Sequence, residues 1–305
     1  MTATTVHRRL HFPIVSQRLA GVLFALVTVV IWAVWIVTTR QAVSAHLPVA
    51  WLGIFRFAVP AIALAPFWWR VGLLPKGVDR RLIGLMVLGA GAPFFLIVAE
   101  GMRHAGAAEI GVLLGGTMPF FVAAIAVVLY RERFGIERLG GFAAILVALA
   151  LIGGGPVIAG SGLGQLLIPL GAALWAIYTH AFKRSGLTAI AASGIVAAWS
   201  TILLLPLALA EGGSAIVAAG PAMVVGQIVS QGVLSGIVAL TCYGAAVARL
   251  GASRAAVFTA LPPALAALVA VPVLGEIPTG TTIAGIVFAV IGVTLASGAV
   301  RLRRT

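Results

Sequence analysis

The sequence predicts an all-α integral membrane protein with about ten transmembrane helices, built as two inverted five-helix repeats. Three observations predict this fold: the apolar composition, a series of apolar runs of membrane-spanning length, and an internal repeat whose loop charges reverse. Of the 305 residues, 62% are hydrophobic and 9% are charged, whereas soluble domains are about 45–50% apolar and about 25% charged. Because only seven residues are acidic, a hydrated surface of mixed charges cannot form, and lipid must cover most of the chain.

Apolar runs divide the chain into ten candidate helices. A helix needs about 20 mainly apolar residues to cross a hydrocarbon layer of about 30 Å. The runs are too long and too continuously apolar for the alternating strands of a membrane barrel, so helices are the remaining way to satisfy the backbone in lipid. The predicted spans cover residues 19–39, 48–69, 82–102, 107–129, 139–155, 164–182, 188–210, 222–247, 254–274 and 280–300.

The two halves of the chain repeat each other. A Trp-Ala-Val-Trp segment begins at Trp32 in the first helix, and a Trp-Ala-Ile-Tyr segment begins 143 positions later at Trp175 in the sixth. Pro119 and Pro263 are 144 positions apart, and each stands thirteen residues before a glutamate. Two separate stretches with nearly the same offset indicate a duplicated unit of five helices.

The charges in the loops indicate that the second repeat is inverted. With five helices in each unit, the second copy must enter the membrane from the opposite side. The loop after the second helix carries four basic residues, while its counterpart after the seventh helix carries Glu211 and no base. Conversely, Lys183 and Arg184 follow the sixth helix, against Arg40 alone after the first. Equivalent loops therefore carry opposite charge bias.

The same charges predict the topology, because basic residues concentrate on the cytoplasmic side. With the N-terminus in the cytoplasm, 17 of the 20 bases lie inside, Arg40 and Arg103 lie outside, and Arg56 lies within the membrane. We therefore expect a multi-pass protein of the inner (plasma) membrane with both termini cytoplasmic. The chain then divides into an N-terminal segment, two repeats and a basic tail, at residues 1–18, 19–155, 156–300 and 301–305.

Several function classes are not expected. The net charge of +13 is spread between apolar runs, which is typical of topology-setting charge and not of nucleic-acid binding. Cys242 is the single cysteine, so neither an intrachain disulfide nor a thiolate metal cluster can form. The sequence has no nucleophile paired with a base at membrane depth and no phosphate-binding glycine loop. We expect no enzyme activity, no cofactor and no metal, and the expected partners are a small-molecule substrate and the bilayer. A monomer is compatible with the sequence, which does not determine the oligomeric state.

These features together resemble the drug/metabolite transporter superfamily, EamA type. The resemblance covers nearly the whole chain. In the first half it rests on the Trp32–Arg40 helix, on Arg56 followed by Phe57, and on the 104–108 segment with Pro119 and residues 130–133. The last group has a counterpart in the second half at residues 251–253, 262–263 and 274–276. It implies export or uptake of small metabolites such as amino acids, by alternating access and without ATP hydrolysis. Glu132 and its isolated counterpart Glu276 are interpreted as helix-end structure.

Of the ionisable residues within the predicted spans, three are the best candidates for a functional site, because a charge at membrane depth costs about 2.5–3.5 kcal/mol on insertion scales. Arg56 either pairs with a carboxylate or helix-end carbonyls, or binds a substrate carboxylate, for which its planar guanidinium is well shaped. Glu100 is a candidate for substrate binding and for proton coupling, or an interfacial partner of Arg103 one turn away. His180 is the other candidate for proton coupling, or a satisfied interfacial group.

Aromatic and polar residues add further candidates for substrate binding. Trp32, Trp35, Trp175 and Tyr178 recur in both halves near the middle of their helices, where they either line a cavity or pack against neighbouring helices. The eighth helix adds Tyr243 and a one-sided polar stripe, which we interpret as cavity lining in preference to interhelical hydrogen bonding. The stripe consists of Gln227, Ser230, Gln231 and Ser235.

Prolines in the fourth and ninth helices, Pro119, Pro262 and Pro263, are predicted hinges because proline removes a helical hydrogen bond. The sequence therefore predicts a secondary transporter for an amino acid or a drug-like compound, with export as the expected direction. The alternatives are a membrane receptor or assembly subunit that does not transport, and a carrier of the same superfamily for another substrate class such as nucleotide sugars.

Overall fold

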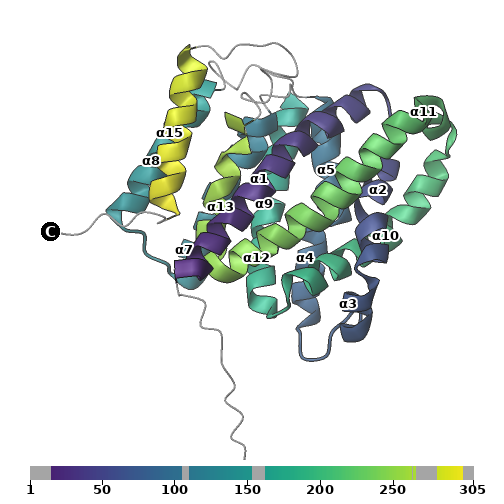
Figure 1. The fold of residues 1–305 in the computed structure, drawn as a ribbon, viewed down its shortest axis with the longest axis horizontal. Helices are drawn as coiled ribbons and strands as arrows, with labels where there is room; N and C mark the ends of the chain where they lie inside the picture. The colour runs from purple at the N-terminus through teal and green to yellow at the C-terminus, as the bar shows by residue number, and fades with distance from the viewer. Residues whose placement is uncertain (1–14, 105–109, 153–161, 263, 266–279, 298–305) are drawn as a thin grey trace, which may run out of the picture.

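The computed structural model describes residues 15–104, 110–152, 162–262, 264–265 and 280–297. Within these ranges all regular secondary structure is helical, as Figure 1 shows. The prediction of an all-α fold is confirmed.

Helices of the first half follow the predicted spans, but several are broken. They are α1 (Val15–Ser44), α2 (Val49–Ala63), α3 (Ala65–Val71), α4 (Arg80–Ala90), α5 (Ala92–Arg103), the π-helix η1 (Gly111–Gly116), α7 (Met118–Tyr130) and α8 (Ile136–Ile152). The predicted 48–69 span divides into α2 and α3, which are bent by 73°. The 82–102 span divides at Gly91, whose ψ of −149° is not helical. Pro93 comes two residues later and has no N–H to continue the helical hydrogen bonds across this break.

Helices of the second half include one long irregular span. They are α9 (Gly162–Ser185), α10 (Ala189–Glu211), α11 (Ser214–Gln227), the π-helix η3 (Ile228–Ala239), α12 (Leu240–Leu250), α13 (Ala252–Val257), the 3₁₀-helix η4 (Phe258–Ala260) and α15 (Gly280–Ala296). The α11–η3–α12 segment runs for 37 residues and is kinked at Gly220, whose φ is +79°. It therefore extends beyond the predicted 222–247 span at both ends.

The number of spans is not confirmed by helix length. In the described part of the chain, six helices are long and apolar enough to cross a membrane, or seven if the bent α2–α3 pair counts as one span. α8 and α15 have 17 residues each, and about half of the predicted ninth helix lies outside the described residues. Large apolar side chains such as Ile62, Val128 and Val217 are 74–81% exposed, which fits lipid and not water as the surrounding medium.

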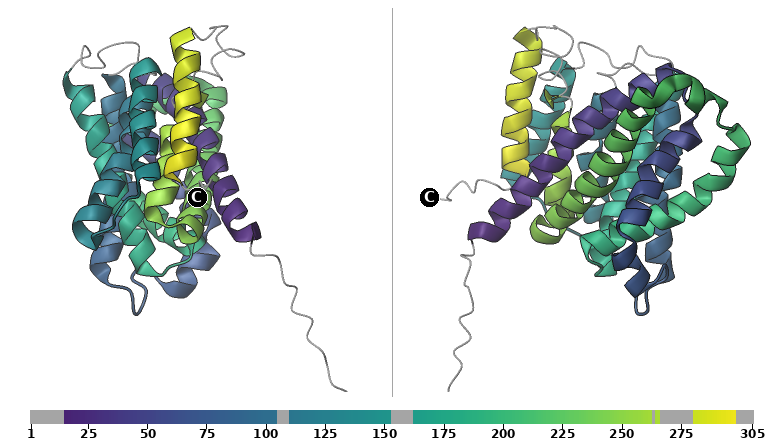
Figure 2. Two further views of the ribbon diagram at one scale, coloured as in Figure 1. Left: turned by 90° about the vertical axis from the view of Figure 1, so that its left-hand side faces the viewer. Right: turned by 45° about the vertical axis from the view of Figure 1, so that its right-hand side comes forward.

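Helix packing relates the two repeats by an approximate two-fold axis. α2 packs on its counterpart α10 and α8 on its counterpart α15, while the α1–α12 contact is matched by the α5–α9 contact and the α1–η3 contact by the α4–α9 contact. Figures 1 and 2 show α8 and α15 side by side at one edge of the bundle.

Individual residues along α2 and α10 obey the same symmetry. Trp51 Nε1 donates to the carbonyl oxygen of Gly212 at 2.7 Å, and the Trp68 ring lies against Gly194. A shift of about 144 positions exchanges these two contacts. These two contacts also show that α2 and α10 are antiparallel. A two-fold rotation maps one helix onto an antiparallel helix only when the rotation axis is perpendicular to the helix. Since the helices cross the membrane, the repeats have opposite orientations in it.

Candidate functional site

Four of the predicted aromatic residues form one buried cluster where α1, α9 and α12 meet. The Trp32 and Trp175 rings pack edge to face with centroids 4.8 Å apart, and Tyr243 lies 5.4 Å from both. Tyr178 lies 5.1 Å from Trp175. Such pairs contribute about 0.5–1.5 kcal/mol beyond their buried area, so the cluster joins the first helix of one repeat to two helices of the other.

Arg56 lies next to this cluster, in the middle of α2. Its side chain is 3% exposed, its Nη1 donates to Ser235 Oγ at 2.7 Å, and its Cζ lies 4.8 Å from the centre of the Trp35 ring. Its Nε has no hydrogen-bond partner, and none of the described carboxylates pairs with it. A buried cation normally pairs with an anion, and this one is held by a hydroxyl and by aromatic faces.

A small cavity separates Arg56 from the aromatic cluster. Its volume is about 20 Å³, close to the space that one water needs, while pockets for small ligands measure about 300–1,000 Å³. It is therefore closed in this conformation and must widen to admit a metabolite. Its lining comes from both repeats and consists of Trp32, Trp35, Ile36, Arg56, Phe94, Leu114, Gly115, Met118, Trp175 and Pro262.

The pseudo-two-fold axis passes beside this cavity. Thr259 Oγ1 donates to the carbonyl oxygen of Gly115 at 3.1 Å, and these two residues are 144 positions apart. A Cβ on Gly115 would lie 2.5 Å from the Thr259 carbonyl oxygen. Gly115 therefore permits the close crossing of η1 and η4, a role that the sequence analysis did not recognise.

The polar stripe of η3 lies against α1. Gln231 Oε1 accepts from Trp35 Nε1 at 2.7 Å, its Nε2 donates to Thr39 Oγ1 at 2.8 Å, and Gln227 Nε2 donates to the Thr38 carbonyl oxygen at 3.0 Å. In this conformation the stripe serves interhelical hydrogen bonding, and neither glutamine lines the closed cavity. Contact of Gln227 and Gln231 with substrate stays a prediction.

The two candidates for proton coupling lie away from the central cavity. Glu100, near the end of α5, pairs with Arg103 Nη1 at 3.2 Å and with His104 Nε2 at 3.3 Å, and its side chain is 42% exposed. His180, near the end of α9, has its Nε2 2.9 Å from the Val122 carbonyl oxygen and its ring 5.2 Å from that of Tyr130. Proton coupling by either residue stays a prediction.

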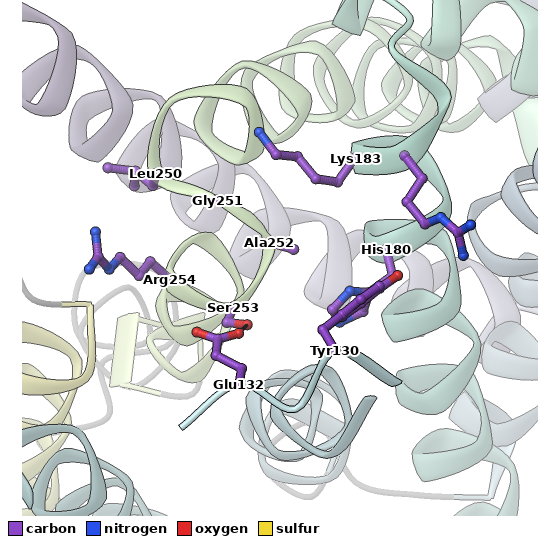
Figure 3. A pocket seen from close by; sticks show the side chains of 10 residues that line it. Tyr130, Glu132, His180, Lys183, Leu250, Gly251, Ala252, Ser253 and Arg254 are labelled. Carbon is purple, nitrogen blue, oxygen red and sulfur yellow. Dashed lines mark hydrogen bonds between the residues drawn. The ribbon is translucent and has the colours of Figure 1, made fainter. Parts of the chain in front are cut away.

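His180 and Tyr130 line a larger crevice at one end of the bundle, where Figure 3 shows their rings facing each other. Its volume is about 470 Å³, and it is lined by Tyr130, Glu132, His180, Lys183, Arg184 and residues 250–254. The basic residues of the crevice belong to loops that the charge pattern of the sequence predicts on the same side of the membrane. This shared side is the feature of the sequence that could have indicated the crevice.

Glu132 connects two elements at this crevice. Its Oε1 accepts from Arg138 Nη1 at 2.7 Å, and its Oε2 accepts from Ser253 Oγ at 2.9 Å. The carboxylate thereby ties the end of α7 to the start of α13.

The predicted hinges have different surroundings. Pro119 is the second residue of α7, directly after the π-helix η1, so it stands at a change of helix type. Pro262 lines the central cavity. Pro263 lies outside the described residues. Motion at these positions stays a prediction.

A family model, a curated relative and a solved structure each match most of the chain. The model of the EamA-like transporter family matches residues 19–154 and 162–298. A "Probable terminal-alkyne amino-acid exporter" from Streptantibioticus cattleyicolor is 27% identical over 289 residues, which are 92% of this chain and 94% of that protein. A crystal structure of a protein superposes with a TM-score of 0.67 at 18% identity, over 92% of this chain and 96% of the other. At that identity the likeness shows the fold alone.

Proposed function

The chain belongs to the EamA-like transporter family, and from this premise we propose that it is a secondary transporter that exports a small carboxylate-bearing metabolite by alternating access. An amino acid or a drug-like acid is the proposed substrate class, and the inner membrane is the proposed location, with both termini cytoplasmic. The EamA-like family and the exporter-named relative indicate a membrane transporter and not an enzyme.

The observation that carries this proposal is the unpaired buried Arg56 beside an aromatic cavity. A guanidinium binds a carboxylate through two parallel hydrogen bonds, and the Nε of Arg56 is free for one of them. The neighbouring rings of Trp35 and Trp175 offer apolar faces to the rest of the substrate. A substrate carboxylate would therefore neutralise a charge that the described part of the chain leaves unpaired.

Alternating access is supported by the closed cavity and the inverted repeat. The cavity of about 20 Å³ is too small for a metabolite, so substrate must enter when the helices around it separate. Because the repeats are related by a two-fold axis, a movement that opens the cavity at one end has a symmetric counterpart at the other. The junctions at Pro119 and Pro262 are the proposed hinges.

Flux through purified protein in liposomes tests the proposal. We expect labelled amino acids to move down their gradients, and we expect Arg56→Ala to abolish this movement while the protein stays folded in the membrane. Arg56→Lys should recover little transport, because lysine cannot form the bidentate pair. Arg249→Ala, which removes an arginine at the bundle end, is the control and should transport normally.

Two results would contradict the proposal. Unchanged transport in Arg56→Ala would make Arg56 a structural residue. Absence of both flux and binding across a broad panel of amino acids, drugs and nucleotide sugars would exclude a carrier and favour a receptor or assembly subunit. Flux of nucleotide sugars alone would keep the carrier and replace its substrate class.

A further inference from the structure

A second cavity opens on the lipid-facing surface, in the groove between the α4–α5 helix and α10. Its volume is about 360 Å³, so it exceeds the central cavity many times over. Apart from one arginine the lining is almost entirely apolar, and it consists of Leu74, Arg80, Ile83, Gly84, Val87, Leu88, Pro93, Trp199 and Leu203. Leu74, Leu88 and Leu203 are 38–47% exposed, so the groove is open to the bilayer.

The internal symmetry explains why this groove exists in one repeat. Its counterpart in the other repeat is the contact between η3 and α2, where a Cβ on Gly232 would lie 2.6 Å from the Phe55 carbonyl oxygen. The corresponding residues 144 positions away are Leu88 and Trp199. In the contact between η3 and α2, a glycine packs directly against a backbone. Two large side chains stand at the equivalent positions of α4 and α10, so α4 cannot approach α10 as closely as η3 approaches α2. The space between them becomes the groove.

The deep end of the groove is held closed by a second symmetric contact. A Cβ on Gly236 would lie 2.5 Å from the Arg56 carbonyl oxygen, and 144 positions away the Ala92 N–H donates to Ser200 Oγ at 3.0 Å. This bond fixes α5 to α10 immediately before Pro93. The groove therefore has a tight inner end and an open outer end.

The length of the groove matches the depth of one leaflet. Arg80 begins α4 and Pro93 follows the Gly91 break, so at 1.5 Å per residue the lining covers about 20 Å along the helix axis. Trp69, 73% exposed in the neighbouring α3, belongs to the class of residue that collects at the membrane interface. Arg80 therefore lies at headgroup level, and the apolar lining extends from it into the hydrocarbon.

The charge at the open end favours an anion. Arg70 at the end of α3, Lys76 in the connection that follows and Arg81 in α4 lie close to Arg80 in sequence, and the connection contains one acid, Asp79. The Asp79 carboxylate accepts from the Arg81 N–H at 2.8 Å and caps α4. Basic residues next to a membrane helix attract anionic lipid headgroups.

We propose that this groove binds one anionic glycerophospholipid, with an acyl chain along the Gly84 face of α4 and its phosphate at Arg80. Gly84 is the floor of the site, because a Cβ there would meet nothing within 4 Å. Its missing side chain leaves the room that the acyl chain occupies. This site is independent of the transported substrate.

Native mass spectrometry of the delipidated protein, titrated with phosphatidylglycerol and in parallel with phosphatidylcholine, tests the site. We expect one phosphatidylglycerol to bind the unchanged protein at least tenfold more tightly than phosphatidylcholine does. Arg80→Gln should remove this headgroup preference. Gly84→Phe should fill the groove and abolish the tight binding of either lipid, and it should fold because the added ring enters open space.

Matched controls separate this site from the ordinary lipid belt. Gly140→Phe places the same ring on an exposed glycine of α8 that also has open space around it, and Arg249→Gln removes an arginine in the last turn of α12 that does not line the groove. Both should bind as the unchanged protein does. Equal binding of the two phospholipids, or tight binding retained in Gly84→Phe, would overturn the proposal, as would equal losses in Gly84→Phe and Gly140→Phe.

Discussion

Buried polar residues in the membrane interior fall into two groups: those whose hydrogen-bonding atoms have partners, and those with an atom that lacks one. Gln231 uses both its oxygen and its nitrogen to bind neighbours on α1 and on its own helix. Arg56 has one neutral partner and an unbonded Nε. Removing a satisfied group should cost stability, and removing an unsatisfied one should cost function, because each is retained for a different physical reason.

Substitution of Gln231 tests the structural half of this division. Gln231→Leu leaves the buried Trp35 Nε1 without its acceptor, and we expect a loss of about 1–3 kcal/mol in stability. A lower melting temperature of the purified protein measures it. Thr294→Ala is the control, because Thr294 bonds only within its own exposed helix turn. Equal melting temperatures for the two variants would mean that the glutamine is dispensable for packing.

Proton coupling is also decided by single residues. If export is driven by proton antiport, the residue that carries the proton must change its charge during each cycle. We expect either His180→Asn or Glu100→Gln to lose the stimulation of liposome flux by a pH gradient while substrate exchange continues. His46→Asn, in the turn after α1, should keep it. Stimulation retained in both variants would exclude both residues, and flux independent of pH would exclude the coupling itself.

At the scale of elements, the π-helix η3 determines how closely the halves pack. A π-helix is rare beyond a single turn, and this one covers 12 residues. It faces α1 with Gln231 and α2 with Gly232 and Gly236. The same element therefore positions Ser235 against Arg56, so a change in its packing reaches the candidate site.

Enlarging a glycine of η3 should separate these elements. Gly236→Leu brings a side chain against the backbone oxygen of Arg56, and overpacking of this kind costs about 1–3 kcal/mol. We expect a lower melting temperature and weaker substrate binding, because Arg56 shifts from Ser235. Gly226→Leu, in open space one helix earlier, should melt at or above the temperature of the unchanged protein. Normal substrate binding in Gly236→Leu would show that the η3–α2 spacing does not position Arg56.

At the scale of the whole molecule, opposite orientation of the repeats makes a topological prediction. Cys242→Ala removes the single cysteine, so a cysteine introduced into this variant is the only one that a thiol reagent can label. We expect an impermeant maleimide on intact cells to label His46→Cys and Glu211→Cys, and to label Lys76→Cys and Lys183→Cys only after the cells are opened. Labelling of all four from one side would exclude inverted repeats, and the reversed pattern would place the termini outside.

The sequence by itself determined the membrane class, the positions of most helices and the duplication. These depend on the length of apolar runs, the charge of loops and the spacing of a few residues, all of which are local and can be counted. The gathering of Trp32, Trp175 and Tyr178 near the axis also follows from their equivalent places in two symmetric halves.

Only the tertiary structure decided which polar groups meet. Glu100 and Arg56 both lie in predicted spans, yet Glu100 pairs at a helix end and Arg56 lies beside a closed cavity. The direction of each side chain depends on how far its helix is rotated about its own axis. That rotation is decided by contacts between residues some 100–200 positions apart, such as Ala92 with Ser200 and Trp35 with Gln231. Composition and spacing do not determine this rotation. Lipid is compatible with any apolar face of a helix, and only packing against other helices selects the face that points inward.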